Sequence, residues 1–466
     1  MKFVNVLFVV LLYCTHLSAQ VTLPNNLYFT HIGVEDGLCQ NTVCCILQDH
    51  LGFIWLGTKD GLTRYDGYRF RVFKHDAADP MSIGNNFIRV LYEDADGLIW
   101  IGTNVGVYIY NPETENFRKF DVATERGDVI SREVSSIKCD SSGDLWIGVN
   151  WQGVFRYDRR DESLELYEPV PGDTTSLSSV HVWDLCFDGD GNLWVGSQNG
   201  GLDRYDRETD RFVRHRLKGL SDVSRIVLDK QNQLLLGTMK DGLFSFNPYM
   251  GTCQPLLLDS GHKDLFVRAI FVRNSREVVV GTENGIYIYD CVTRKTRHVN
   301  QELGNPYSLS CKAVYSIYCD KEGALWIGTY FGGVNYLPPS SSLIFDKFYP
   351  IGHSDRLSGK AVREFVRDES GIIWIGTEDQ GLNRFDPVSG KFTHYNSRNS
   401  GLSCDNVHGL CVDGDRLYIG TFFGGFNIMD LKTNEIVALG SQMLPDDSVF
   451  SIFRDHDGRI WVGLTY

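Results

Sequence analysis

The sequence predicts an all-β fold, a β-propeller with one seven-bladed ring of four-stranded antiparallel blades followed by about three blades of a second, incomplete propeller. Three observations support this prediction. A unit of about 45 residues occurs ten times, each unit carries the signals of four short strands, and a proline- and serine-rich segment interrupts the repeat after the seventh copy. Four strands in about 45 residues is the size of one propeller blade.

The repeated unit has a constant order of signals. It reads apolar run, Asp-x-x-Gly, apolar-Trp-apolar-Gly-Thr, short loop and Gly-apolar-x-x-Tyr-Asp, and its first copy contains Asp49, Gly52, Trp55, Gly57 and Tyr65. The glycine after the tryptophan position recurs at intervals of 41 to 48 residues. Seven copies keep the structural tryptophan: Trp55, Trp100, Trp146, Trp194, Trp326, Trp374 and Trp461. The other three copies have Leu235, Val279 and Tyr418.

Each unit predicts its four strands in order. The apolar run, such as residues 42–48, is the first strand, and Asp-x-x-Gly makes the turn because Asp bonds nearby backbone and Gly accepts positive φ. The second strand, such as residues 98–101, is apolar at every position, which indicates burial on both faces between two blades. The third strand carries Gly-apolar-x-x-Tyr, and the fourth is polar and outermost, as in residues 117–120 and 391–395.

The repeat divides into two parts near residue 340. Residues 338–342 read Pro-Pro-Ser-Ser-Ser, and prolines cannot donate to a sheet. Residues 28–32 precede the first copy as a strand-like segment, and residues 345–349 stand in the same relation to the eighth copy. A leading strand of this kind completes the last blade of its own ring. We therefore expect a seven-bladed propeller over residues 22–339 and the start of a second over 340–466, cut off in mid-blade.

The N-terminal residues indicate where the protein is located, and the net charge limits its partners. Residues 1–19 read as a secretory signal peptide, with Lys2 before an apolar stretch and Leu17-Ser18-Ala19 as the cleavage site. We expect an exported, periplasmic protein. The net charge of −14 makes nucleic acid and anionic membrane surfaces poor partners.

Cysteine positions argue against a disulfide framework or a zinc site. The twelve cysteines contain no C-x-x-C and no paired Cys/His spacing. Six of them lie in the apolar first strands, where a small buried side chain fits: Cys44, Cys45, Cys139, Cys186, Cys319 and Cys411. We expect free core cysteines, with an isolated bridge as the alternative, and neither a metal nor a cofactor.

The motif Asp-x-x-Gly-x-[Ile/Leu]-Trp-[Ile/Val/Leu]-Gly-Thr, followed by Gly-Leu-x-x-Tyr-Asp, resembles the two-component regulator propeller repeat. The resemblance covers nearly everything after the signal peptide. It implies the periplasmic sensor region of a Bacteroides-type hybrid two-component receptor, which detects an oligosaccharide. It places histidine kinase activity and membrane contact in downstream segments that this chain lacks, and it allows a homodimer of the full-length receptor.

The sequence predicts no catalytic residue in this chain. The twelve histidines are scattered, without H-E-x-x-H or a recurring carboxylate partner. The aspartates of Asp-x-x-Gly are interpreted as turn formers. Trp183-Asp184 matches a WD dipeptide, but it lies on an apolar first strand and is interpreted as coincidence.

A binding site is predicted on the loops between second and third strands, which emerge at one end of the ring. Amides and charges there suit sugar hydroxyls, and exposed aromatic rings suit a sugar face. The alternative is that the aromatic residues pack on neighbouring blades. The candidate ligand-binding residues are Lys59, Asp60, Asn104, Asn150, Trp151, Gln198, Asn199, Lys240, Glu283, Asn284, Tyr330 and Phe331.

Two other functions remain open at this point. A propeller lyase would need a catalytic histidine with an acid or metal partner on one face of the ring. A scaffold or adhesion module would bind protein rather than glycan. The fold does not separate these from a sensor, because site chemistry decides function.

Overall fold

The computed structural model describes residues 22–217, 220, 222–257, 265–339, 347–349, 356–439 and 444–465. The predicted signal peptide therefore lies outside the described residues. The chain divides into two compact units, residues 1–344 and 345–466. No helix in the described part of the chain is long and apolar enough to span a bilayer.

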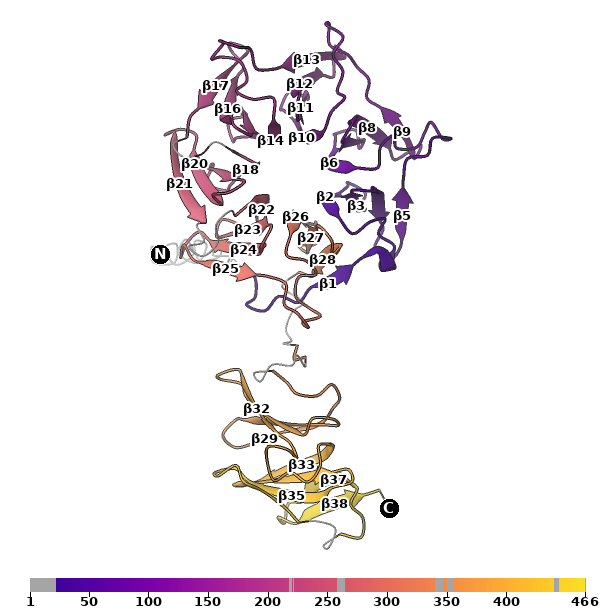
Figure 1. The fold of residues 1–466 in the computed structure, drawn as a ribbon, viewed down its shortest axis with the longest axis vertical. Coiled ribbons are helices and arrows are strands. Elements are labelled where there is room, and N and C mark those ends of the chain that lie inside the picture. Colours follow the sequence, from indigo (N-terminus) through magenta and orange to yellow (C-terminus); the bar gives the residue numbers. More distant parts are fainter. Residues whose placement is uncertain are drawn as a thin grey trace, which may run out of the picture. The chain divides into compact units, whose positions relative to one another are not determined.

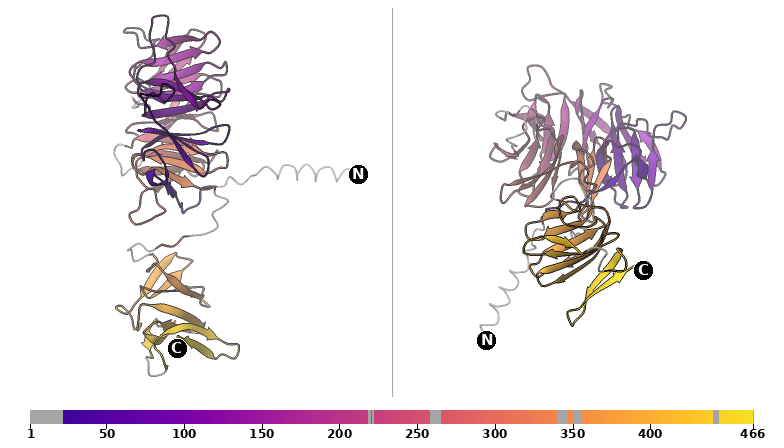
Figure 2. Two further views of the ribbon diagram at one scale, coloured as in Figure 1. Left: turned by 90° about the vertical axis from the view of Figure 1, so that its right-hand side faces the viewer. Right: turned by 60° about the horizontal axis from the view of Figure 1, so that its bottom comes forward.

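Seven four-stranded antiparallel sheets make up the described part of the first unit and surround a common axis (Figure 1). Seen edge-on, this unit is a disc whose sheets stand side by side (Figure 2). The first strand of each repeat lies nearest the axis. These innermost strands are β2 (Val43–Gln48), β6 (Ile88–Glu93), β10 (Val134–Cys139), β14 (Val182–Phe187), β18 (Arg225–Leu228), β22 (Val267–Val272) and β26 (Val314–Cys319).

The remaining strands of each blade follow outward in chain order. The second strands are β3 (Ile54–Thr58), β7 (Ile99–Thr103), β11 (Leu145–Val149), β15 (Leu193–Ser197), β19 (Leu234–Gly237), β23 (Glu277–Thr282) and β27 (Leu325–Thr329). The third strands are β4 (Gly61–Tyr65), β8 (Gly106–Asn111), β12 (Gly153–Asp158), β16 (Gly201–Asp206), β20 (Leu243–Asn247), β24 (Gly285–Asp290) and β28 (Val334–Leu337). The outer strands are β5 (Phe70–Phe73), β9 (Asn116–Lys119), β13 (Ser163–Tyr167), β17 (Arg211–His215), β21 (Thr252–Leu257), β25 (Thr296–Val299) and β1 (Thr30–Ile32).

The N-terminal segment closes the ring. β1 pairs antiparallel with β28, with Thr30 opposite Tyr336 and Ile32 opposite Val334, so the seventh blade takes its outer strand from the start of the chain. This confirms the leading strand expected at residues 28–32. A short 3₁₀ turn, η2 (Val34–Asp36), follows β1. Ahead of β1, the backbone N–H of Leu23 donates to the carboxylate of Glu277 on β23 at 2.9 Å, which fastens the segment to the sixth blade.

One hydrogen-bonded unit repeats in the blades with Asp and Trp. In the fourth blade, Trp194 Nε1 donates to Asp188 Oδ2 at 2.8 Å, while Asp188 Oδ1 accepts the backbone N–H of Asn192. The aspartate therefore holds its own turn and the indole together. The same Asp–Trp bond measures 2.8–3.1 Å in all seven copies that keep the tryptophan. The sequence analysis recognised the turn but not this bond.

The glycine after the tryptophan allows the blades to approach. A Cβ on Gly57 would lie 2.4 Å from Cys45 Sγ and 2.7 Å from Ile88 Cγ2 of the next blade. β3 is buried at every position, as the unbroken apolar pattern predicted. The fifth and sixth copies, which lack tryptophan, also form complete blades with Leu235 and Val279 buried.

The second unit contains two complete four-stranded sheets and one pair of strands in its described part. Of the strand expected at residues 345–349, only 347–349 are described, and they belong to no strand. The strands of the unit are β29 (Val362–Arg367), β30 (Ile373–Thr377), β31 (Leu382–Asp386), β32 (Lys391–Tyr395), β33 (Val407–Asp413), β34 (Arg416–Thr421), β35 (Gly425–Asp430), β36 (Ile436–Ala438), β37 (Val449–Arg454) and β38 (Ile460–Leu464).

The cysteines that the structure describes are all free. Cys186 and Cys411 are buried, as expected for core residues. Cys44 differs from that expectation, because its side chain lines a cavity on the axis of the first unit.

Candidate functional site on the ring axis

A β-bulge turns one side chain of each innermost strand toward the axis. In β2 the register passes from Val43 opposite Thr58 to Cys45 opposite Gly57, which leaves Cys44 without a cross-strand partner. The same shift occurs in five more blades of the ring. Bulges often re-aim a side chain near a functional site. The six bulge residues of the ring are Cys44, Arg89, Ser135, Trp183, Arg268 and Tyr315.

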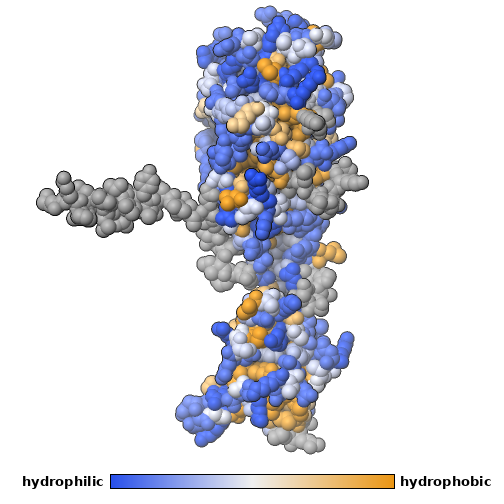
Figure 3. Space-filling model, turned by 90° about the vertical axis from the view of Figure 1, so that its left-hand side faces the viewer, coloured by the Kyte–Doolittle hydropathy of each residue, from blue (hydrophilic) through white to orange (hydrophobic). Residues whose placement is uncertain are grey.

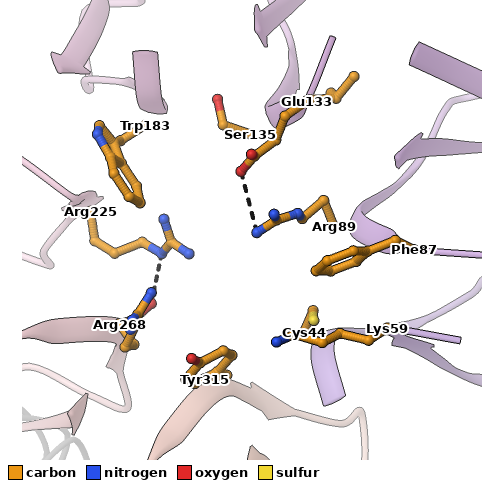
Figure 4. A pocket seen from close by; sticks show the side chains of 11 residues that line it. Cys44, Lys59, Phe87, Arg89, Glu133, Ser135, Trp183, Arg225, Arg268 and Tyr315 are labelled. Carbon is orange, nitrogen blue, oxygen red and sulfur yellow. Dashed lines mark hydrogen bonds and ion pairs between the residues drawn. The ribbon is translucent and has the colours of Figure 1, made fainter. Parts of the chain in front are cut away.

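These six bulge residues line one cavity of about 190 Å³. The fifth blade contributes Arg225, so every blade of the ring supplies a side chain. Figure 4 shows the guanidinium groups of Arg89 and Arg225 pointing toward each other across the cavity. The lining is completed by Lys59, Phe87, Glu133 and Val134. We name this cavity the axial pocket.

Two arginines of the axial pocket are fixed by acceptors from their own or a neighbouring blade. Arg89 donates from Nε to Asn104 Oδ1 at 2.7 Å and pairs through Nη1 with Glu133 at 3.2 Å. Arg268 forms an ion pair with Glu283 at 2.6 Å. Bonds of this kind hold a guanidinium in one orientation, so its remaining N–H groups are already aligned for a ligand.

Arg225 and Lys59 are bonded to neutral acceptors. Arg225 donates from Nε to the carbonyl of Arg268 at 2.7 Å and from Nη1 to the carbonyl of Ser224 at 2.8 Å. Lys59 donates to the Tyr330 hydroxyl at 3.0 Å and lies 4.1 Å from the centre of that ring. Burial lowers the pKa of Arg225, although the charge of Asp184 acts in the opposite direction.

Aromatic rings form the apolar part of the pocket. Arg268 lies 4.6 Å from the centre of the Tyr315 ring, and Arg89 lies 4.1 Å from that of Phe87. Trp183 presents a partly exposed indole, and its buried Nε1 has no hydrogen-bond partner among the described residues. A buried indole N–H normally finds an acceptor, so an unpaired one is unusual.

The pocket has the chemistry of binding rather than of catalysis by its thiol. Burial raises the pKa of Cys44 to about 11, so the group is a thiol and not a nucleophilic thiolate at neutral pH. None of the eleven residues lining the pocket is a histidine. Within the described ranges, no group of three or more His, Cys, Asp or Glu side chains is arranged to hold a metal ion.

The predicted loop residues occupy three kinds of position. Four contribute to the pocket wall or hold its cations through the contacts given above: Lys59, Asn104, Glu283 and Tyr330. Three bond to side chains elsewhere, Asp60 to Lys74 and Asn86, Asn150 to His181, and Asn284 to Asn300. Gln198 is partly buried, and the rest are exposed: Trp151, Asn199, Lys240 and Phe331.

The bulge residues were missed by the sequence analysis, although a signal for them exists. In each innermost strand they follow the first apolar residue, as Arg89 follows Ile88 and Arg268 follows Val267. A charged or aromatic residue recurring at this one place in an apolar strand indicates a side chain that leaves the core. Trp183, interpreted above as coincidence in an apolar strand, lies at this place and faces the axial pocket.

The model of the family described as "Two component regulator propeller" matches residues 37–60, 82–105, 176–199, 308–331 and 443–466. Histidine kinase P4 of Formosa agariphila is 39% identical over 59 residues, which is 13% of this chain and only 4% of that protein.

Solved structures show the same fold. The extracellular domain of the putative hybrid two-component system BT3049 from B. thetaiotaomicron superposes with a TM-score of 0.69 at 23% identity, over 94% of this chain and 70% of that chain. The corresponding domain of BT4673 gives 0.59 at 20% identity, over 94% and 64%. Virginiamycin B lyase from Staphylococcus aureus gives 0.52 at 12% identity, over 67% and 99%. Five segments of this chain therefore match the two-component regulator propeller repeat, and its fold is that of the extracellular domain of BT3049.

Proposed function

We propose that this chain is the extracytoplasmic ligand-sensing region of a hybrid two-component receptor, and that it recognises an oligosaccharide in the axial pocket. The observation that carries the proposal is the convergence of one side chain from every blade on a single cavity. A site built from all seven blades couples ligand binding to the geometry of the whole ring. The repeats and the fold shared with extracellular domains of two-component systems support the sensing role.

The proposal includes the organisation of the longer receptor. Residues 1–19 direct export to the periplasm, residues 22–339 form the ligand-binding propeller and residues 340–466 open a second propeller. Kinase activity belongs to downstream segments. A ligand signals by stabilising one of two arrangements of the receptor, so its effect is limited by the difference in its affinity for the two.

The pocket supports binding more than the lyase alternative. Its groups are mainly cationic and aromatic, and its one carboxylate, Glu133, is paired with Arg89.

A thermal-shift screen of the chain against defined oligosaccharides tests the proposal. We expect one glycan class to raise the melting temperature with concentration, because selective binding to the native state stabilises it by RT ln(1 + [L]/Kd). The control is the same screen with Trp183→Ala, which removes the indole from the pocket wall. A flat response to every glycan, from a sample that melts cooperatively, would contradict the proposal.

A further inference from the structure

The axial pocket is positively charged in a negatively charged protein. Four cationic side chains line it, Lys59, Arg89, Arg225 and Arg268, and Glu133 is the one carboxylate among the lining residues. Glu283, which follows β23 and does not line the pocket, forms an ion pair with Arg268. The chain as a whole has a net charge of −14. The cations are therefore concentrated at the axis against the overall charge of the protein, and a concave site concentrates their field further.

Two of these charges form no ion pair with any described carboxylate. In the part of the chain that the structure describes, no carboxylate lies within ion-pair distance of the Arg225 guanidinium or the Lys59 ammonium. Their bonds go to two carbonyls and one tyrosine hydroxyl, which are neutral. A partly desolvated charge without an opposite charge is unfavourable, and an anion entering the pocket would relieve that cost.

The geometry of the arginines also fits an oxyanion. Arg89 and Arg225 face each other across the cavity (Figure 4), and each uses only part of its donors on the protein. Planar guanidinium groups present paired N–H donors that match the oxygens of carboxylate and sulfate.

The size of the pocket limits what enters it. A volume of about 190 Å³ is smaller than the roughly 300–1,000 Å³ of sites that enclose a drug-sized ligand. It has room for a single terminal unit of a longer ligand. The remainder of the ligand would extend out of the pocket.

We propose that the axial pocket binds an acidic sugar unit at the end of an oligosaccharide, through a carboxylate or sulfate group held between Arg89 and Arg225. This inference rests on the proposed function and names the ligand class. It makes charge, and not only shape, the basis of specificity.

Titration calorimetry of the chain with four probes tests the inference. The probes are a uronic-acid-terminated disaccharide, a sulfated disaccharide, a neutral disaccharide of the same linkage, and inorganic sulfate. We expect at least one acidic disaccharide to bind ten times more tightly than the neutral one. Which of the two binds identifies the group as carboxylate or sulfate.

Two substitutions with opposite expected effects sharpen the test. Arg225→Gln removes an unpaired cation and should weaken binding of the acidic disaccharide at least tenfold. Glu133→Gln removes the carboxylate that competes for Arg89 and should tighten binding several-fold. The matched controls are Arg71→Gln and Glu115→Gln, whose ion pair lies among the outer strands of the ring, and both should leave affinity within twofold.

The outcomes separate this inference from the proposed function. Equal affinity for neutral and acidic disaccharides, with no gain in Glu133→Gln, would overturn the inference and leave the oligosaccharide sensor standing. Sulfate binding as tightly as the sulfated disaccharide would support the anion site and contradict oligosaccharide recognition. Absence of binding by all four probes would overturn the inference. If Arg225→Gln fails to fold, Glu133→Gln still decides, because Glu133 bonds to Arg89 and not to the backbone of β18.

Discussion

Trp194 in the first unit and Trp461 in the second occupy the same position of the repeat and make the same 2.8 Å bond to an aspartate. Trp194 is 1% exposed and Trp461 is 58% exposed. Around Trp194 lie Val223 and Phe246 from the following blade. The hydrogen bond therefore forms within one blade, whereas burial of the indole depends on the blade beside it.

The same difference extends over other surfaces of the two units. Phe365 on β29 is 71% exposed, whereas Ile137 and Leu185, at the same position of two blades in the closed ring, are buried. Figure 3 shows hydrophobic side chains at the surface of the second unit among hydrophilic ones. Each blade can form its local bonds alone, but a ring is needed to bury its apolar faces.

The largest expected effect tests this dependence on neighbours. Trp194→Ala should destabilise the first unit by about 3–5 kcal/mol, because it removes a large buried side chain and leaves a cavity. Trp461→Ala should cost less than about 1 kcal/mol, because its indole already contacts water. Hydrogen exchange of β15 and β38, measured by mass spectrometry, reports the free energy of opening in each unit. Equal losses at the two sites would contradict the account.

A buried carboxylate in the ring provides a comparison with amides at the same repeat position. Asp203 on β16 is fully buried and accepts the backbone N–H of Ser178, as Asn383 does from Ser358 and Asn427 does from Ser403. Burial raises the pKa of Asp203 to about 6. Its folded-state pKa is therefore higher than the unfolded value of about 3.9. The folded state binds the proton more tightly, so stability from this group is complete below about pH 4 and is lost as pH rises through 6.

Asp203→Asn should therefore raise the free energy of unfolding at pH 7.5 by up to about 3 kcal/mol, since each pKa unit corresponds to about 1.4 kcal/mol. At pH 3.5 the variant and the wild type should be nearly equal. Urea unfolding at both pH values measures the difference, with Asp161→Asn at an exposed position as the control. A variant that is less stable at pH 7.5 would show that the ionised carboxylate is favourable at this site.

The Asp–Trp bond should show a smaller difference between the units. Asp188→Ala leaves the Trp194 N–H buried without an acceptor, which costs about 1–3 kcal/mol. Asp455→Ala exposes the Trp461 N–H to water, which replaces the lost acceptor, so we expect a cost below about 1 kcal/mol. The backbone N–H groups of Asn192 and Arg459 donate to the two aspartates. Their hydrogen-exchange rates therefore report the stability of each turn. Equal losses of stability in Asp188→Ala and Asp455→Ala would contradict this expectation, because they would show that burial of the indole N–H does not matter.

Repetition made the blades predictable from the sequence. Ten copies of one pattern define where each strand begins, and the buried second strands follow from unbroken apolar runs. The strand at residues 28–32 was predictable because the seventh copy lacks an outer strand of its own before residues 338–342. Such a fold can be predicted from sequence because the turn residues and the apolar pattern indicate the same strands.

The candidate site was only partly predictable. The loops at one end of the ring were identified, and Lys59 lies in the pocket, but the direction of each side chain depends on backbone detail. Asn284 turns outward to Asn300, and Trp183 turns inward because a bulge interrupts the alternation of β14. A bulge of one residue leaves no turn signal in the sequence, and its mark is a charged or aromatic residue at one place in an apolar strand, which only comparison between the repeats brings out.

The central claim is that ligand is bound on the ring axis and not by the exposed loops. Titration of a binding oligosaccharide into Trp183→Ala and Trp151→Ala compares the two places, because Trp183 lines the axial pocket and Trp151 is exposed on a loop. Melting temperatures of both variants without ligand serve as the folding control. The account predicts at least a tenfold loss of affinity in Trp183→Ala, about 1.4 kcal/mol, and less than twofold in Trp151→Ala. A tenfold loss in Trp151→Ala, with Trp183→Ala unchanged, would contradict it.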